Sequence, residues 1–174
     1  CDKSRDMSNL PTKSEIEAAA QTVYAAMPPT PQYVWPLLNA AAGATVWVKH
    51  ENHTPIGAFK VRGGLVYLAN LRRDKPDVEG VIAATRGNHG QSIAFAARAQ
   101  GIQAVIVVPE GNSTEKNAAM QAFGAELLVH GHDFQAALEC AQGLAGERGL
   151  EMVPSYAMEL APGVATYGME LLAA

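Results

Sequence analysis

Short apolar runs alternate with longer amphipathic stretches from residue 44 to the end of the chain. One run, Val105-Ile106-Val107-Val108, is apolar at every position, which is typical of a strand buried on both faces. Runs of this kind, rich in β-branched residues and bounded by turn-forming residues, predict strands. The expected strands are residues 45–48, 81–84, 104–108, 126–129 and 152–153.

Between these runs, apolar residues recur three and four positions apart, the spacing of an amphipathic helix. Asp133 is the expected N-cap of one helix, and Gly101 and Gly124 are expected to end two others in the left-handed conformation. The expected helices are residues 59–71, 88–100, 114–123, 133–145 and 164–172. This alternation of strands and helices predicts an α/β fold, a parallel sheet with helices on both faces.

The N-terminal residues have a different pattern. Residues 1–13 are polar and aperiodic, which predicts a loose arm. Ser14 and Glu17 have the spacing of a capping box, so we expect a helix that starts there and runs to about Met27. The prolines within residues 28–31 end this helix and predict an extended connector.

Composition narrows the class of protein. Of 174 residues, 48% are hydrophobic and 17% are charged, which suits a globular domain with its own core, and we expect Trp35 and Trp47 in that core. The net charge of −4 and the lack of a basic run argue against nucleic acid and anionic membranes as partners. No apolar run approaches the roughly 20 residues that span a bilayer.

Cysteine and histidine usage adds two expectations. Cys1 is terminal and Cys140 lies in a helical pattern, so no structural disulfide is expected, and a reducing, cytoplasmic location is predicted. No metal site is expected at His130 and His132, because no pair of acidic residues or cysteines accompanies them.

One turn carries a lysine in an unusual setting. Pro55 and Gly57 break regular structure between an expected strand and an expected helix. Lys60 lies in the first turn of that helix, beside Phe59 and close to a second cation, Arg62. A lysine amine is a nucleophile only when deprotonated, and partial burial beside another cation lowers its pKa. The alternative interpretation is a solvated lysine with no special role.

A second turn joins the expected strand 81–84 to the helix expected from Asn88. In open α/β sheets, ligands bind at the carboxyl ends of strands. Gly87 and Gly90 let the backbone approach a ligand, and free N–H groups at the helix start attract an anion. The chain contains neither G-x-G-x-x-G nor a P-loop motif, which argues against nucleotide binding.

Together, two stretches about 25 residues apart resemble the fold-type II pyridoxal-phosphate enzymes, in particular the threonine/serine dehydratase branch, which includes serine racemase. They are Pro55-Ile56-Gly57-Ala58-Phe59-Lys60-Val61-Arg62-Gly63 and Thr85-Arg86-Gly87-Asn88-His89-Gly90-Gln91. The resemblance runs from about Pro28 to the end of the chain. It implies the small domain of the tryptophan synthase β-like fold and pyridoxal 5'-phosphate as cofactor.

The resemblance implies cofactor roles for three residues. Lys60 matches the lysine that forms the Schiff base with pyridoxal phosphate and then acts as general base. Phe59 matches the aromatic residue that packs against the pyridine ring. Asn88 matches the asparagine that hydrogen-bonds the phenolic oxygen of the ring.

The resemblance also implies a substrate site. Thr85, with the backbone of Gly87, Asn88 and His89, matches the loop that holds the substrate carboxylate. Arg86 stands where racemising members place a small hydroxyl residue, usually serine, as the acid/base opposite the lysine. A guanidinium cannot exchange protons at neutral pH, so we expect elimination without appreciable racemisation. The charge of Arg86 either favours a substrate with a second acidic group or pairs with a carboxylate of the protein.

The implied activity is that of an ammonia-lyase (dehydratase), which converts a β-hydroxy amino acid such as L-threonine or L-serine to a 2-oxo acid and ammonia. A 3-hydroxyaspartate dehydratase, a β-replacement enzyme and a racemase are alternatives on the same fold. A non-catalytic small-domain binding module is a further alternative, which the presence of both Lys60 and Asn88 disfavours.

The family's glycine-rich loop for the cofactor phosphate lies beyond the matched part, and no such run occurs here. We therefore interpret the chain as the truncated, N-terminal portion of a longer protein. Residues 1–54 would be an N-terminal arm and large-domain elements, residues 55–157 the small mobile domain, and residues 158–174 the start of the remaining large domain. We expect a homo-oligomer at full length, and weak or no binding of pyridoxal phosphate by this portion alone.

Overall fold

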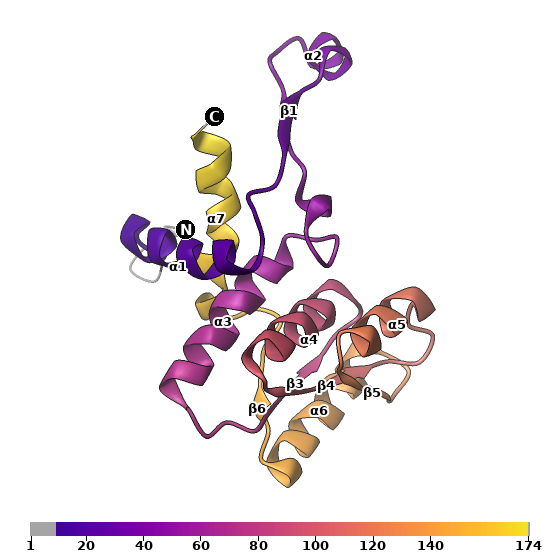
Figure 1. Ribbon diagram of the computed structural model, residues 1–174. Helices are drawn as coiled ribbons and strands as arrows, with labels where there is room; N and C mark the ends of the chain where they lie inside the picture. The colour runs from indigo at the N-terminus through magenta and orange to yellow at the C-terminus, as the bar shows by residue number, and fades with distance from the viewer. Residues whose placement is uncertain (1–9, 174) are drawn as a thin grey trace, which may run out of the picture.

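A four-stranded parallel sheet lies at the centre of the computed structural model, which describes residues 10–173 (Figure 1). Its strands follow the spatial order β5 (Glu126–Val129), β4 (Gln103–Val108), β3 (Gly80–Ala84) and β6 (Glu151–Met152). In the central pair, Ile82 of β3 lies opposite Val105 of β4. Consecutive parallel strands need a crossover connection, which the amphipathic segments of the sequence provide as helices.

Helices cover both faces of this sheet, which confirms the predicted fold class. The helices are α4 (Asn88–Gln100) and α5 (Thr114–Ala122) on one face, with α3 (Lys60–Asp74) packed on α4, and α6 (Phe134–Arg148) on the other. Side chains alternate along β3: Val81 and Ala83 belong to the first core, whereas Ile82 and Ala84 belong to the core under α6.

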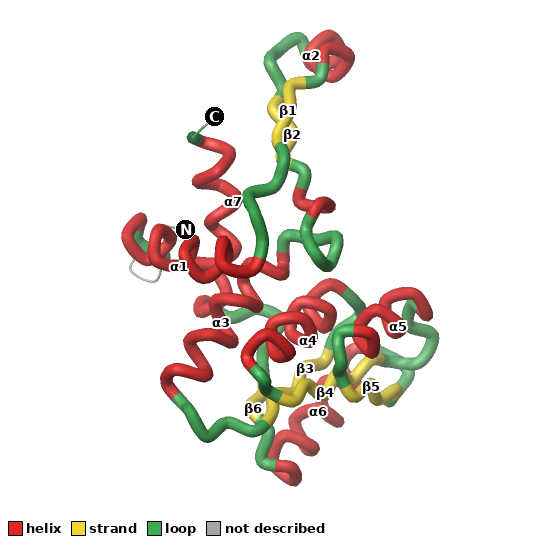
Figure 2. The backbone as a smooth tube through the Cα atoms, viewed as in Figure 1, coloured by secondary structure: helices red, strands yellow, loops and turns green. Residues whose placement is uncertain are grey.

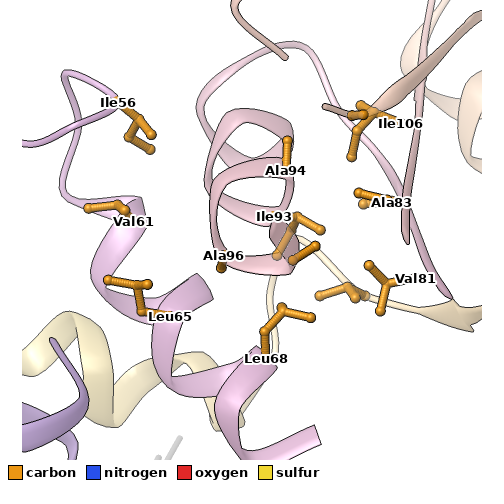
Figure 3. Packing of buried hydrophobic residues seen from close by; sticks show 14 of the residues in the cluster. Ile56, Val61, Leu65, Leu68, Val81, Ala83, Ile93, Ala94, Ala96 and Ile106 are labelled. Carbon is orange, nitrogen blue, oxygen red and sulfur yellow. The ribbon is translucent and has the colours of Figure 1, made fainter. Parts of the chain in front are cut away.

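The first core links α3 to the sheet through α4. Figure 3 shows Leu65 and Leu68 of α3, Ile93 of α4, and Val81 and Ile106 of the sheet within it. All five side chains are almost completely excluded from water. Because burial of apolar surface is the dominant favourable term in folding, this core fixes the start of α3 relative to the carboxyl edge of the sheet.

The first and last helices, α1 (Lys13–Ala26) and α7 (Ala161–Leu172), pack together beside α3. The predicted capping box at Ser14 and Glu17 is wrong. Thr12 caps α1 instead: its hydroxyl accepts the Glu15 N–H at 3.3 Å, and the Glu15 carboxylate accepts the Thr12 N–H at 2.7 Å. Thr12 and Glu15 have the same spacing as the predicted pair, and the helix begins at the earlier of the two. Of the predicted loose arm, residues 1–9 lie outside the described residues.

A two-stranded antiparallel ribbon extends away from the sheet and carries a short helix at its tip (Figure 2). Its elements are β1 (Gln32–Val34), α2 (Pro36–Ala42) and β2 (Trp47–Lys49). The strand predicted at 45–48 therefore belongs to this ribbon and not to the parallel sheet. The placement of Trp35 and Trp47 in the core is also wrong, since they are 44% and 50% exposed. Within residues 10–173, no second layer packs on the ribbon to bury them.

The other predicted elements are present, with ends shifted by a few residues. α4 and β5 have the expected bounds, and Asp133 caps α6 by accepting the Ala136 N–H at 2.9 Å. Gly101 and Gly124 have φ values of 64° and 94°, which confirms their left-handed conformation. Two short 3-10 helices, η2 (Glu51–His53) and η3 (Met158–Leu160), precede α3 and α7. None of the helices within residues 10–173 is long and apolar enough to cross a membrane.

Candidate active site

A cavity of about 500 Å³ lies beyond the carboxyl end of β3, where open α/β sheets bind ligands. Five separate segments contribute to its wall: the start of α3, the loop between β3 and α4, the first turn of α5, the start of α6 and the segment after β6. Its lining residues are Lys60, Thr85, Arg86, Gly87, Asn88, His89, Lys116, Phe134, Ser155 and Tyr156. The predicted substrate residues and Lys60 are therefore brought together.

The position of Lys60 is set by the turn that precedes it. The Thr54 hydroxyl accepts the Ala58 N–H and donates to the Ala58 carbonyl, both at 2.9 Å, which closes the turn. Gly57 has a φ of 67°, a conformation that favours glycine. Lys60 is the first residue of α3, and its ammonium lies 5.2 Å from the centre of the Tyr156 ring. Partial burial lowers the pKa of Lys60, which raises the neutral fraction of its amine.

The start of α3 is fastened to α4. The Ser92 hydroxyl donates to the Lys60 carbonyl at 2.7 Å. Gly64 allows this approach, because a Cβ there would collide with Ser92 Oγ and lie 3.1 Å from the Ser92 carbonyl oxygen. The lysine backbone is thus held by a buried neighbour while its side chain reaches the cavity.

Thr85 shapes the loop that follows β3. Its hydroxyl oxygen accepts the Gly87 N–H at 2.9 Å and the Gly90 N–H at 3.2 Å. Thr85 is buried, and its own N–H donates to the Val107 carbonyl of the neighbouring strand. The Gly87 N–H, which was predicted to face a substrate carboxylate, is therefore committed to Thr85.

The first N–H groups of α4 have no such commitment. The Gln91 N–H donates to the Gly87 carbonyl at 3.1 Å, so intrahelical bonding begins there. Among the described residues, the N–H groups of Asn88 and His89 have no hydrogen-bond acceptor. Orphan N–H groups at a helix start, together with the helix dipole, favour an anion. The anion site predicted here is thus reduced to these two groups.

His89 fixes the start of α4 to the segment after β6. Its ring Nε2 lies 3.2 Å from the Val153 carbonyl, and because a carbonyl can only accept, Nε2 carries the proton. Burial lowers the pKa of His89 to about 4, and the Lys60 charge adds to this effect. His89 is therefore neutral at pH 7.

A second, apolar cavity of about 210 Å³ adjoins the first between α3 and α7. Phe59, Gly63, Leu160 and Val164 line it, and it shares Lys60, His89 and Tyr156 with the larger cavity. Phe59 lies in this smaller cavity, where its ring meets Tyr167 edge to face at 6.1 Å. Lys60 thus lies between the larger cavity, which Arg86 and Lys116 also line, and the smaller, apolar cavity.

Four lining residues were not predicted: Lys116, Phe134, Ser155 and Tyr156. Lys116 is in the first turn of α5, and Ser113 is the N-cap of this helix. The serine before the helix was the one local feature of the sequence that indicated where Lys116 lies. Ser155 donates to the Ala84 carbonyl at 3.4 Å, which holds the segment after β6 against the end of β3. These residues reach the cavity through the topology of the sheet, which no local motif encodes.

Comparison with known proteins gives a consistent result. The family model "Pyridoxal-phosphate dependent enzyme" matches residues 23–174. The L-threonine dehydratase biosynthetic IlvA of Haemophilus influenzae is 34% identical over 151 residues, which are 86% of this chain and 29% of that protein. The L-threo-3-hydroxyaspartate ammonia-lyase of Saccharomyces cerevisiae is 32% identical over 164 residues, which are 94% of this chain and 50% of that protein.

Solved structures extend the likeness to the fold. A pyridoxal 5'-phosphate-dependent aspartate racemase has a TM-score of 0.89 and 29% identity, over 93% of this chain and 51% of that one. The chain spans between 29% and 51% of the length of these three proteins.

Proposed function

Because the chain belongs to the pyridoxal-phosphate-dependent enzyme family, we propose that it forms the lysine-bearing part of an ammonia-lyase. The proposed reaction deaminates a β-hydroxy amino acid such as L-threonine or L-serine to a 2-oxo acid and ammonia. One observation carries the proposal: Lys60 shares a cavity with the orphan N–H groups of Asn88 and His89. An α-amino acid would meet a base and a carboxylate site in one place. The relatives named threonine dehydratase and 3-hydroxyaspartate ammonia-lyase support this reaction class.

The residues around Lys60 fit the cofactor. An aldehyde needs an accessible primary amine of lowered pKa, which Lys60 provides. The Asn88 side chain lines the same cavity and makes no hydrogen bond to any described residue, so it is free to bind a ring oxygen. Phe59 and Tyr156 offer aromatic surface beside the lysine. When bound, pyridoxal phosphate supplies an electron sink for negative charge at the substrate α-carbon.

The chain's own residues supply positioning and proton transfer. We assign the carboxylate of the substrate to the N–H groups of Asn88 and His89. Lys60 Nζ, in its neutral form, is the base that takes the α-proton, and its lowered pKa raises the fraction of that form. The proton taken by Lys60 is returned to the hydroxyl of the β-carbon, which leaves as water. Hydrolysis of the resulting 2-imino acid then releases ammonia and the 2-oxo acid.

Arg86 supports elimination over racemisation. It lines the cavity, and its guanidinium cannot exchange a proton at neutral pH. A racemase needs an acid/base on each side of the α-carbon, and Arg86 occupies the sequence position at which a serine is expected for that role. The domain division at residues 54 and 157, the homo-oligomer and the cytoplasmic location stay predictions.

Borohydride reduction of the full-length protein, followed by peptide mapping, is expected to place pyridoxal phosphate on Lys60. Lys60→Ala should lower the rate of deamination of threonine and serine by about 10²- to 10⁴-fold, because it removes the base. The matched control is Lys75→Ala, since Lys75 ends the same helix and pairs with Glu151 at 2.5 Å. Its activity should stay close to that of the wild type.

Two results would contradict the proposal. A cofactor label on another lysine, with unchanged visible absorbance in Lys60→Ala, would remove the assigned base. Formation of D-serine from L-serine at a rate comparable to pyruvate would identify a racemase in place of a lyase.

A further inference from the structure

Three basic side chains among the described residues make no hydrogen bond or ion pair, and all three line the same cavity. Residues 10–173 contain eleven lysines and arginines. Eight of them have a side-chain hydrogen bond or ion pair, from Lys13 with Glu17 to Arg148 with Glu126. Lys60, Arg86 and Lys116 have none among the described residues, and each of them lines the 500 Å³ cavity.

The wall of this cavity contains no carboxylate among the described residues. The Ala136 N–H and, to a smaller extent, the charge of Arg86 lower the pKa of Asp133, whose carboxylate caps α6 by accepting that N–H at 2.9 Å. Arg86 makes no ion pair with it. The alternative in which Arg86 pairs with a carboxylate of the protein therefore finds no support in residues 10–173.

Lys116 lies directly against the loop that carries Arg86. A Cβ added to Gly87 would come within 2.6 Å of Lys116 Cδ and 2.9 Å of its Nζ, so the lysine chain occupies the space above Gly87. Ser113 caps α5 through the Lys116 N–H at 3.3 Å, which fixes the backbone from which this side chain extends. Two unpaired cations thus flank one glycine, next to the orphan N–H groups of Asn88 and His89.

One carboxylate is accounted for by the N–H groups of α4, which leaves Arg86 and Lys116 without an anion. We infer that Arg86 and Lys116 form a second anion subsite, which takes the distal carboxylate of a four-carbon dicarboxylic amino acid such as 3-hydroxyaspartate. The inference rests on the proposed function and names its substrate class. In such a substrate two carbons separate the carboxylates, and both proposed subsites line the same cavity. The phosphate of the cofactor is the other source of an anion that these cations could bind.

A pair of unreactive acids tests the subsite by calorimetry on the full-length protein. Succinate and butyrate have the same number of carbons, and succinate has a carboxylate where butyrate has a methyl group. Succinate is expected to bind at least about tenfold more tightly, because hydrogen bonds to charged groups contribute more than neutral contacts. Arg86→Gln and Lys116→Gln should each bring the ratio of the two dissociation constants toward one. Arg98→Gln, at the far end of α4, should leave the ratio unchanged.

Kinetics on threonine and 3-hydroxyaspartate give a second, independent reading. 3-Hydroxyaspartate has a carboxylate on the β-carbon where threonine has a methyl group. Arg86→Gln should therefore lower kcat/KM for 3-hydroxyaspartate about ten- to a hundredfold more than for threonine. An equal loss for both substrates, with an unchanged succinate to butyrate ratio, would overturn the subsite. Weaker binding of pyridoxal phosphate to both variants, with the ratio unchanged, would assign the cations to the cofactor phosphate and would also overturn it.

Failure of the proposed function gives a different result. If neither threonine nor 3-hydroxyaspartate were deaminated, the ammonia-lyase proposal would fall, and the succinate to butyrate ratio would still decide whether the two cations bind a second carboxylate.

Discussion

His89 shows how burial, as the largest cause, determines the charge of a residue in the cavity wall. Its side chain is only 5% exposed, and the hydrogen bond to Val153 does not offset the loss of water. A protonated ring would place a second positive charge beside Lys60. The neutral ring instead serves as a fixed donor that connects the start of α4 to the segment after β6.

The free energy of unfolding is expected to fall as the pH is lowered from 6.5 toward 4. The pKa of His89 is about 4 in the folded chain against 6.5 as its ordinary value, so the unfolded state binds more protons in this window. The stability is fully present above pH 6.5, and at 1.36 kcal/mol per pKa unit the loss reaches about 3 kcal/mol near pH 4. Denaturant titrations across this range measure it.

His89→Gln is the matched variant, since a glutamine amide can donate to the Val153 carbonyl but does not titrate. The difference in unfolding free energy between wild type and His89→Gln should change with pH between 6.5 and 4. A difference that is constant with pH for His89→Gln would show that the residue is not held neutral by the fold.

Part of the cavity wall was predictable residue by residue, and part was not. Lys60 and Asn88 each begin a helix after a turn, which the turn residues indicated, and their expected roles came from the resemblance to fold-type II pyridoxal-phosphate enzymes. Lys116 had no comparable signal, because its partner in space is Gly87, which belongs to the preceding crossover. A contact between the first turns of two helices depends on the order of strands in the sheet, which the sequence does not state.

At the scale of elements, the position of Lys60 depends on how closely α3 approaches α4. The sequence predicted both helices from their apolar periodicity. It did not predict their separation, because Gly64 is one glycine among several and only the fold places it against Ser92. The hydrogen bond from Ser92 to the Lys60 carbonyl exists only at this short separation.

Gly64→Ala is expected to destabilise the protein by about 1–3 kcal/mol, since the new methyl group would collide with buried Ser92 and force α3 away from α4. Equilibrium unfolding measures the effect. The double variant with Ser92→Ala should recover part of the lost stability, because it removes the Ser92 hydroxyl oxygen with which the new methyl group would collide.

The matched control for this substitution is Gly143→Ala in the middle of α6, where a Cβ meets nothing within 4 Å. It should stabilise the protein by up to about 1 kcal/mol, as alanine does in an open helix position. Changes in unfolding free energy of opposite sign for the two substitutions would confirm that packing decides the result. A stabilising Gly64→Ala would show that the two helices are free to separate.

At the scale of the whole molecule, a buried ionic cluster joins segments from both ends of the chain. Arg62 is fully buried and donates to Glu51 at 2.8 and 2.9 Å, to Glu170 at 2.5 and 3.0 Å, and to Thr166 at 2.9 Å. Glu170 also accepts from Lys49 at 2.6 Å and from Tyr24 at 2.9 Å. The cluster therefore holds α1, β2, η2, α3 and α7 to one another.

Arg62→Met is expected to lower the free energy of unfolding by about 3–5 kcal/mol, because it leaves two carboxylates without their shared partner in a buried site. Thermal or denaturant unfolding measures the loss. The double variant Arg62→Met, Glu51→Gln should be more stable than Arg62→Met, since it removes the carboxylate that has lost its cation, whereas Glu170 keeps its ion pair with Lys49. Arg73→Met removes an exposed ion pair on the same helix and should change little. A double variant less stable than the single one would contradict this account.

The fold class was predictable because the alternation of strands and helices repeats along most of the chain. The antiparallel ribbon was not. Gln32–Val34 is too short for a periodic signal, and the run that contains Trp47 reads equally well as a strand of the parallel sheet. Which partner a strand takes is a property of the whole chain, and the two tryptophans were misplaced for that reason.

This ribbon contains both tryptophans of the chain, and that gives it a built-in optical label. Trp47 pairs with Val34 in the ribbon, and Trp35 follows that valine directly. Fluorescence excited at a wavelength that only the tryptophan indole absorbs therefore reports on the ribbon alone. Any event that covers it removes water from both rings and shifts their emission to shorter wavelength. The aromatic neighbours of Lys60 in its cavity are Phe59 and Tyr156, so this cavity contributes no tryptophan fluorescence. Without an added dye, a change in indole emission can therefore be assigned to the ribbon and not to the cavity.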